Sequence, residues 1–593
     1  MRCHSSLMAL VASILAVVEG AVIHSRALPG VKVTFQETTI CETTPGVKGY
    51  SGYVTLPATL DPAIPFESNM FFWFFESRQS PATAPTTLWL QGGPGAASID
   101  QAVSGHNGPC SVNPDSKTTT LNPNSWNSVS NMIYIDNPVQ TGFSHDGVLK
   151  QGVIDTQTGD VNVDNPANPT NWLTVKGTFP SGDQTRMVNT TTTAARAIYH
   201  AMQAFFDQFP QYHRDKVNVW SQSYGGHYAP AIASLINQEQ ANPGSVLGTP
   251  GAASSSNKGK RAATAFGVNS IGIINGWVDQ LTQAPFLMTY NNNNSYGIKS
   301  YSDDTAQKLS TQFNAPGGCM DLTKQCRQLI IDKDAAGFAN DPDVVKACAA
   351  ASTSCLTIIG QNDAASGRNS FDLAQVLPLG FPYPYEVGWL NDAGVQSALG
   401  VKMNYTRSIS STTNYFLSSG DLVRPFTDVI GQLLDQGVKV AMVYGDRDWR
   451  CNWLSGEAVS LSVKYGDSAK FAAAGYTDVK VGKTVAGKVR QYGLFSFTRV
   501  FNAGHEVPLY KPAEALSIFT RTIMGKDVAT GSSDAAGFTS SGPSSVFDVM
   551  QKADPLPAPI CYVLDAPIGQ RCTADQIKAL GDGSAVVKDY IVS

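Results

Sequence analysis

Short apolar runs alternating with one long amphipathic segment dominate the first half of the chain. The runs have strand length and stand at residues 70–75, 87–91, 132–135 and 217–220. Runs of this length bounded by turn residues predict buried strands. Before the last of them, residues 190–209 carry apolar residues at helical spacing and end at Pro210, which predicts a helix. This alternation predicts an α/β fold with a parallel sheet.

The remaining pattern predicts edge strands, one long excursion and a second group of core strands. Residues 31–56 mix β-branched and aromatic residues with glycine, as edge strands do. Residues 146–185 are rich in Gly, Asp, Asn, Thr and Pro, which predicts a surface excursion. Apolar strands resume at 438–444 and 494–501.

The N-terminus has the pattern of a secretory signal peptide. Arg2 and His4 precede an apolar stretch at 7–18, and small residues at Val18 and Gly20 offer a cleavage site. A buried N-terminal helix is the alternative. No later stretch reaches about 18 consecutive apolar residues, so we expect no membrane association after signal removal.

Two further features fit a secreted protein. Acceptor sequons at Asn189, Asn293 and Asn404 predict glycosylation. The pair Lys260-Arg261, in a Gly/Ser-rich loop at 244–262, is either a processing site or a solvated loop.

Composition excludes several classes of protein. The 593 residues are 42% hydrophobic, so a large core forms and disorder is excluded. The formal net charge of −5 and the lack of long basic runs argue against a nucleic-acid partner. The eight histidines are scattered without paired metal-ligand spacing, and no Gly-Lys-Ser/Thr follows the glycine loop at 92–95. We therefore expect neither a metal nor a phosphate-bearing cofactor.

Three residues follow three predicted strands in the order of a hydrolase triad. Ser223 lies just after strand 217–220, with the small residues Ser221 and Gly225 two positions away on either side. This is a variant of the G-x-S-x-G nucleophile elbow, although Ser/Gly turns without catalytic function are common. Asp448 and His505 each follow a later apolar strand. Open α/β sheets build their sites at this carboxyl edge.

Each residue type has a chemical reason. A serine becomes nucleophilic when a base, here His505, takes its proton. The carboxylate of Asp448 would hold the imidazole in the right tautomer. The oxyanion hole needs two N–H donors, expected from the backbone of Tyr224 and from the glycine loop at 92–95. An ordinary loop histidine is the alternative for His505 taken alone.

These segments resemble the serine carboxypeptidase family, particularly its fungal secreted members. Residues 89–95 (WLQGGPG) resemble the family's W-L-N-G-G-P-G loop, and residues 221–228 (SQSYGGHY) resemble its G-E-S-Y-x-G-x-Y segment. Residues 274–279 (INGWVD) resemble I-G-N-G-x-x-D, residues 445–452 resemble G-D-x-D-x-x-C-N, and residues 504–508 resemble G-H-x-V-P. The resemblance implies an α/β-hydrolase fold with a mixed central sheet. It also implies release of C-terminal amino acids through an acyl-enzyme, without cofactors, by Ser223, Asp448 and His505 with oxyanion donors Gly93 and Tyr224.

The substrate-binding positions depart from the family pattern. The resemblance assigns substrate contacts to Trp89, Gln91, Gly92, His106, Gln222 and Asn275. In the family, an asparagine at the position of Gln91 and a glutamate at that of Gln222 bind the substrate's terminal carboxylate, and a second glutamate, at the position of His106, supports them. A glutamate donates a hydrogen bond only when protonated, whereas a glutamine amide donates at any pH. We therefore hypothesise that binding depends less on acidity, unless His106 titrates. Loss of exopeptidase selectivity is the alternative.

The cysteines predict four disulfides and one free thiol. Cys319 and Cys326 are seven residues apart, as are Cys348 and Cys355, so each pair lies on one helix face. An antiparallel helical hairpin would pair them nested, Cys319–Cys355 and Cys326–Cys348, and the family has a comparable arrangement. The other expected pairs are Cys41–Cys110 and Cys561–Cys572. By resemblance Cys451 is a free thiol near the site, or else a small buried hydrophobe.

The expected organisation is a signal peptide and a core interrupted by a cap. The segments are 1–20 (signal peptide), 21–280 (core, first part), 281–380 (disulfide-bearing, mainly helical cap), 381–525 (core, second part) and 526–593 (C-terminal tail with a local disulfide). The expected function is a secreted or vacuolar carboxypeptidase acting on peptide or protein C-termini. The alternatives are an esterase or acyltransferase with the same triad, and a non-catalytic binding homologue.

Overall fold

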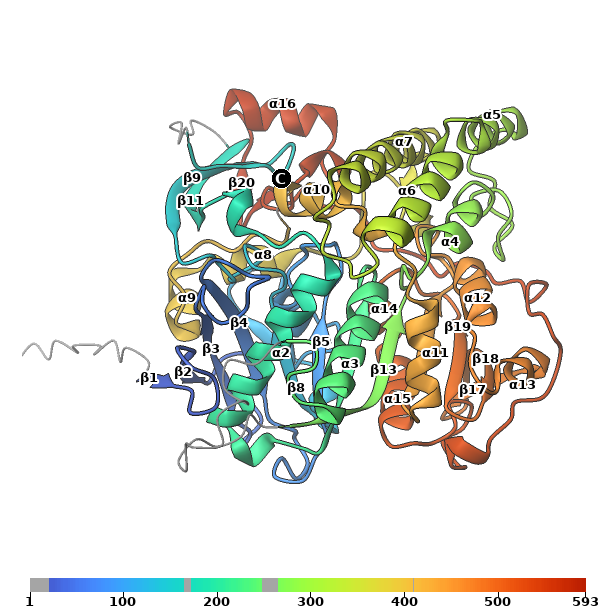
Figure 1. Ribbon diagram of the computed structural model, residues 1–593. Coiled ribbons are helices and arrows are strands. Elements are labelled where there is room, and N and C mark those ends of the chain that lie inside the picture. The colour runs from blue at the N-terminus through green and yellow to red at the C-terminus, as the bar shows by residue number, and fades with distance from the viewer. Residues whose placement is uncertain (1–20, 165–171, 248–264, 409) are drawn as a thin grey trace, which may run out of the picture.

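The computed structural model describes residues 21–164, 172–247, 265–408 and 410–593. The predicted signal peptide and Lys260-Arg261 lie outside these ranges. A mixed twelve-stranded sheet forms the centre of the protein (Figure 1). In spatial order its strands are β1 (Ala21–His24), β2 (Lys32–Thr38), β3 (Gly49–Leu56), β4 (Ser68–Phe75), β8 (Asn131–Ile135), β5 (Thr86–Leu90), β12 (Lys216–Gln222), β13 (Gly267–Ile274), β16 (Lys439–Gly445), β19 (Phe495–Val500), β18 (Thr484–Tyr492) and β17 (Tyr476–Val481).

The sheet is parallel in its middle and antiparallel at both edges. The six strands from β8 to β19 pair in parallel. Strands β1 to β4 form an antiparallel ribbon on one side, and β18 and β17 form one on the other. The carboxyl ends of β12, β16 and β19 therefore meet at one edge, where Ser223, Asp448 and His505 follow them. The predicted α/β-hydrolase fold is confirmed.

Both faces of the sheet are buried, which explains the continuous apolar runs. Successive residues of β4 alternate between the two faces. Phe72 and Phe74 pack in one core with Phe205 of α2 (Thr191–Gln208). Phe71 and Trp73 belong to the opposite core, together with Phe519 of α15 (Pro512–Ile523). The helix expected at 190–209 is thus present and covers one face.

A helical insertion follows β13 and lies at one end of the sheet (Figure 1). It contains α4 (Gln280–Leu287), α5 (Asp303–Asn314), α6 (Cys319–Lys333) and α7 (Pro342–Ser366). By length and composition alone α7 is apolar enough to cross a membrane. However, it is joined to α6 by Cys319–Cys355 and Cys326–Cys348, so it is fixed within the helical insertion.

The excursion expected at 146–185 lies mostly at the surface, but it contains strands that the sequence did not predict. The segment forms a small antiparallel sheet of β9 (Leu149–Asp155), β10 (Val161–Asn162) and β11 (Thr174–Pro180). Most of its side chains are half-exposed, so the polar composition masks the strand pattern. A sheet that is partly exposed on both faces lacks the alternation of apolar and polar residues by which strands are predicted.

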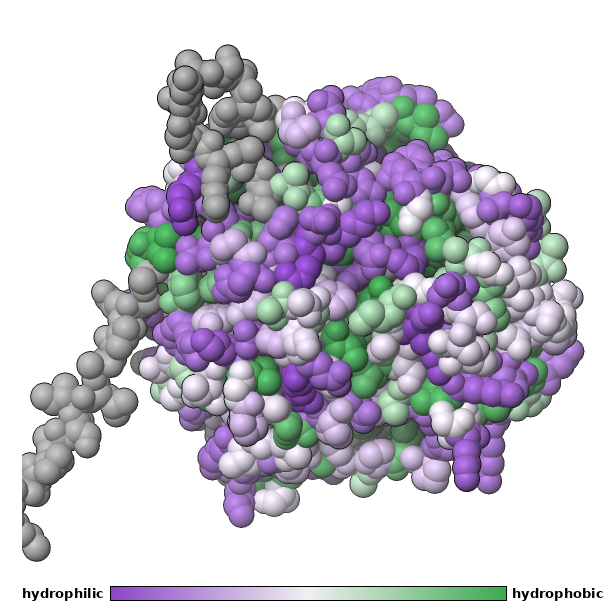
Figure 2. Space-filling view, turned by 90° about the horizontal axis from the view of Figure 1, so that it is seen from below, coloured by the Kyte–Doolittle hydropathy of each residue, from purple (hydrophilic) through white to green (hydrophobic). Residues whose placement is uncertain are grey.

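The C-terminal tail folds back onto this small sheet. Helix α16 (Ala574–Asp582) lies near β9 and β11 in Figure 1, and a Cβ at its Gly581 would lie 3.2 Å from Leu173, next to β11. The backbone N–H of Ile568 donates to Thr156 O (2.9 Å), and the Cys561–Cys572 disulfide closes the loop. The opposite end of the molecule, seen from below in Figure 2, shows hydrophilic and hydrophobic residues interspersed.

Candidate active site

Ser223 occupies a strained turn between β12 and α3 (Gly225–Ala241). Its φ of 63° lies in the left-handed region that L-residues seldom adopt. The turn is tight, because a Cβ at Gly225 would lie 2.4 Å from Ser221 Cβ. The backbone N–H of Ser223 donates to Ile274 O (3.0 Å) at the end of β13. Strain of this kind, fixed by its surroundings, is characteristic of a nucleophile elbow.

His505 and Asp448 form a buried hydrogen-bonded pair beside this turn. His505 Nδ1 donates to Asp448 Oδ2 (2.6 Å), which leaves Nε2 as the free ring nitrogen. Asp448 is fully buried and also accepts bonds from the Cys451 N–H (3.1 Å) and Asn275 Nδ2 (2.8 Å). The backbone N–H of His505 donates to Phe371 O (2.9 Å). The carboxylate therefore fixes both the tautomer and the orientation of the imidazole.

The glycine loop lies against the nucleophile turn. A Cβ at Gly92 would lie 2.4 Å from Tyr224 N and 2.8 Å from Ser223 Cβ, so only glycine fits there. Gly93, with φ +106°, also requires glycine. The loop backbone therefore approaches Tyr224 N closely, as two oxyanion donors must.

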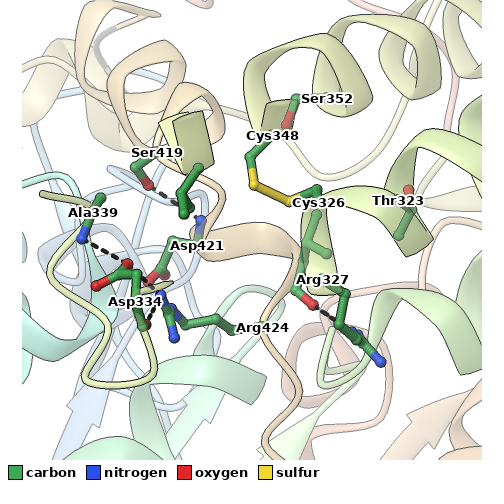
Figure 3. The surroundings of a disulfide bond; sticks show 12 residues. Thr323, Cys326, Arg327, Asp334, Ala339, Cys348, Ser352, Ser419, Asp421 and Arg424 are labelled. Atoms are coloured by element: carbon green, nitrogen blue, oxygen red, sulfur yellow. Dashed lines mark hydrogen bonds and ion pairs between the residues drawn. A yellow bond between two sulfur atoms is a disulfide. The ribbon is translucent and has the colours of Figure 1, made fainter. Parts of the chain in front are cut away.

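Tyr224 is held by the buried carboxylate of Asp421, which lies in no recognisable sequence motif. Its hydroxyl donates to Asp421 Oδ2 (2.5 Å), and Asp421 Oδ1 accepts from Thr191 N at the start of α2 (2.9 Å). Figure 3 shows Asp421 beside Ser419, near the Cys326–Cys348 disulfide. The Arg424–Asp334 ion pair (2.6 Å) joins this segment to the end of α6. The disulfide-bearing helical insertion is thus connected to the residue after the nucleophile.

The residues expected to bind the substrate's carboxylate meet next to Ser223. His106 Nε2 donates to Gln222 Oε1 (2.9 Å), so the amide nitrogen of Gln222 faces away from His106. Among the described residues, that buried nitrogen has no hydrogen-bond partner. Burial lowers the pKa of His106 to about 3, which keeps its imidazole neutral above that pH. Trp89 packs beside His106, with ring centroids 5.4 Å apart.

A cavity of about 270 Å³, termed the catalytic cavity, contains the triad serine and histidine. Its lining comes from the glycine loop and the triad (Gln91, Gly93, Ala96, Ser223, His505), from the insertion (Asn369, Phe371, Leu379, Pro382), from the core (Arg407, Glu506, Tyr510) and from the tail (Asp565, Ala566, Pro567, Gln570, Arg571). No sequence motif indicates that these tail residues line the cavity, although the Cys561–Cys572 pair does indicate a folded segment there.

The role predicted for Asn275 requires correction. The residue is fully buried, and both polar atoms of its amide already have partners within the protein. Its Nδ2 donates to Asp448 Oδ2, and its Oδ1 accepts from Gly445 N (2.9 Å). Asn275 therefore lies behind the triad and positions Asp448 rather than contacting substrate.

The cysteines are arranged as predicted. The disulfides are Cys41–Cys110, Cys319–Cys355, Cys326–Cys348 and Cys561–Cys572. Cys451 is free and buried. Burial and the neighbouring Asp448 raise the pKa of its thiol, so it stays protonated. Among the sequons, Asn293 is exposed, whereas Asn189 and Asn404 are half-buried; we expect glycosylation first at Asn293.

A charged cluster lies in the wall of the catalytic cavity. Arg407 pairs with Glu386, with Asp565 (2.6 Å) and with Asp100 (3.4 Å). Arg571 also pairs with Asp565. The three carboxyls outnumber the two guanidinium groups, so one carboxyl is best accommodated with a proton. Burial and the neighbouring Asp100 raise the pKa of Glu386 well above its usual value.

This cluster makes stability depend on pH. The folded protein holds a proton on Glu386 that the unfolded chain releases above about pH 4.3. The contribution of this proton to the free energy of unfolding is therefore complete below that pH. It is lost as the pH rises through the raised pKa of Glu386 in the folded protein. We expect the free energy of unfolding to fall by about 1.4 kcal/mol per pH unit for this proton. Urea unfolding at pH 4.5, 6 and 7.5 measures the slope. Glu386→Gln should flatten it, and an unchanged slope would contradict the assignment.

The site combines a nucleophile turn at Ser223, the His505–Asp448 pair and a glycine loop, at Gly92 and Gly93, that packs against the turn. These features define a serine hydrolase of the α/β-hydrolase fold. A model of the serine carboxypeptidase family matches residues 40–525. The chain therefore belongs to the serine carboxypeptidase family.

Relatives of known name support this membership. The chain is 38% identical over 590 residues to carboxypeptidase S1 homolog A of Arthroderma otae, covering 97% of this chain and 89% of that one. It is 33% identical over 497 residues to carboxypeptidase S1 of Penicillium janthinellum (83% and 98%). The crystal structure of Kex1(Δ)p, a prohormone-processing carboxypeptidase from Saccharomyces cerevisiae, shares the fold, with a TM-score of 0.57 at 19% identity, covering 81% of this chain and 92% of that one.

Proposed function

We propose that this protein removes single amino acids from peptide C-termini with Ser223 as nucleophile, His505 as base and Asp448 as the group that orients the base. The observation that carries the proposal is the 2.6 Å His505–Asp448 bond beside a strained serine in one cavity. His505 takes the Ser223 proton as Oγ attacks the scissile carbonyl, and returns it to the departing amine. Water then hydrolyses the acyl-enzyme with the same histidine as base.

The oxyanion of each tetrahedral intermediate would accept bonds from the N–H groups of Gly93 and Tyr224. Donors of this kind are each worth about 3–4 kcal/mol of barrier. Asp421 and Gly92 support the proposal, because one anchors the Tyr224 side chain and the other leaves its N–H accessible.

Exopeptidase selectivity would come from amide donors aimed at the substrate's free carboxylate. Gln222 Nε2 is buried without a partner, and Gln91 lines the catalytic cavity. The neutral His106 fixes the Gln222 amide by donating to its oxygen. Neither the amide nor this histidine titrates between pH 4 and 8, so we expect carboxylate binding to persist at neutral pH.

The test is residue release from one blocked apolar dipeptide, as free acid and as amide, between pH 3.5 and 8. We expect a preference for the free acid of at least tenfold, since hydrogen bonds to a charged group contribute about 1.5–3 kcal/mol. The preference should persist at pH 7. Equal cleavage of acid and amide would contradict carboxypeptidase selectivity and favour a different acyl substrate.

We further propose that the protein acts in the secretory pathway or outside the cell. The four disulfides support an oxidising compartment, as do the predicted signal peptide and sequons.

A further inference from the structure

A second cavity, of about 210 Å³, lies next to the catalytic cavity and is termed the lateral cavity. Arg407, Asp565 and Ala566 line both, so one layer of side chains separates the two. The rest of its lining includes Trp172 and Phe179 of the small-sheet segment, Tyr405 and Thr406 of the core, and Leu564 and Tyr590 of the tail. Neither the triad nor the oxyanion donors line it.

The chemistry of the lateral cavity suits an apolar side chain carried on a polar backbone. Trp172 stands at its edge, 37% exposed, with its ring against Tyr590 (centroids 6.2 Å apart). Phe179 and Leu564 add apolar surface. The hydroxyls of Tyr405 and Thr406 are buried and have no hydrogen-bond partner among the described residues. A buried hydroxyl without a partner is costly, and a ligand's amide or carbonyl would relieve that cost.

One short segment, residues 404–408, joins the lateral cavity to the oxyanion loop. At one end, Asn404 N donates to Thr178 O of β11 (2.8 Å). At the other end, Ser408 pairs with Ala96, and Arg407 O accepts from Ala97 N (2.9 Å). Asn404 and Ser408 are four residues apart along the chain, so their Cα atoms are separated by at most roughly 14 Å. An extended peptide at the oxyanion loop would therefore reach the lateral cavity within about four residues.

We propose that the lateral cavity binds the part of a peptide substrate upstream of the scissile bond, taking an apolar or aromatic side chain two to four residues before the cleaved position. This rests on the proposed function, because an enzyme that releases one C-terminal residue leaves all other substrate residues upstream. The free carboxylate is bound on the side of Gln91 and Gln222, neither of which lines the lateral cavity. The tail residues Leu564–Ala566 and Tyr590, which lie beyond the matched family region, complete this site.

Binding to the Ser223→Ala protein, which forms no acyl-enzyme, tests the proposal by calorimetry. The ligands are a blocked dipeptide free acid and the same sequence extended upstream by three residues that include one phenylalanine. We expect the longer peptide to bind about tenfold more tightly. Adding Trp172→Ala or Thr406→Val should reduce that ratio severalfold. Ile331→Ala removes an exposed apolar side chain of α6 that lines neither cavity and should leave the ratio unchanged.

The outcomes separate this inference from the proposed function. If the longer and the shorter peptide bind with equal affinity, the lateral cavity is not a substrate site. The same conclusion follows if neither Trp172→Ala nor Thr406→Val reduces the advantage of the longer peptide. Hydrolysis of the blocked dipeptide by the unmodified enzyme is measured separately. If the unmodified enzyme does not hydrolyse the dipeptide but still binds the longer peptide more tightly, the proposed carboxypeptidase function is wrong. The lateral cavity would then remain a peptide-binding site.

Discussion

Ser223→Ala should lower kcat by a factor of about 10⁴ to 10⁶, because the alanine cannot form the acyl-enzyme. KM should change little, since the Gln222 amide and the oxyanion donors are unaltered. Residual turnover above the uncatalysed rate is expected, because the N–H groups near Gly93 and Tyr224 still stabilise charge on a substrate attacked by water. Steady-state kinetics on an apolar dipeptide measures the loss.

The chain provides a matched control two residues away in the same turn. Ser221 is also buried, and its hydroxyl donates to Gly225 O (2.8 Å) instead of facing the catalytic cavity. Ser221→Ala should cost about 1 kcal/mol of stability and leave kcat within a few-fold. A serine-reactive phosphonate should label the Ser221→Ala protein and not the Ser223→Ala protein. Labelling of Ser223→Ala would place the nucleophile elsewhere.

The sequence predicts the triad well because its signals are local. Each of Ser223, Asp448 and His505 lies within four residues after a run of apolar residues, and parallel strands bring their carboxyl ends to one edge. The nested disulfides are predictable for a similar reason. A spacing of seven residues fixes the helix face, and two such pairs fit only one antiparallel hairpin.

The walls of the site are less predictable because they depend on long-range packing. Asp565 is held at the catalytic cavity by ion pairs with Arg407 and Arg571, and the backbone of Ile568 bonds to the small-sheet segment at Thr156. No periodicity in a Ser/Gly-rich tail indicates where it will dock. The positioning role of Asn275 is not predictable from its motif, because a motif gives the residue's position in the sequence and not the partner of its side chain.

Gln222→Glu should make substrate binding dependent on acidity. The new carboxyl would sit in a fully buried position against the substrate's carboxylate, which is ionised above about pH 3.5. When protonated it can donate a hydrogen bond in place of the amide; when ionised it repels the substrate. Losing a charged hydrogen bond costs about 1.5–3 kcal/mol, so kcat/KM at pH 7.5 should fall 10- to 100-fold. At pH 4 the loss should be only a few-fold.

The comparison with Gln222→Met separates donor loss from charge repulsion. Methionine fills a similar volume without a donor or a charge. It should therefore lower kcat/KM for the free acid by the same factor at every pH. The unmodified enzyme should show a flat KM between pH 4.5 and 7.5, because His106 is already neutral there. If its KM instead rose steeply with pH, or if Gln222→Glu matched it at pH 7.5, the Gln222 amide would not be the group that binds the carboxylate. Because amidated peptides lack that carboxylate, the three proteins should cleave them at rates that differ far less.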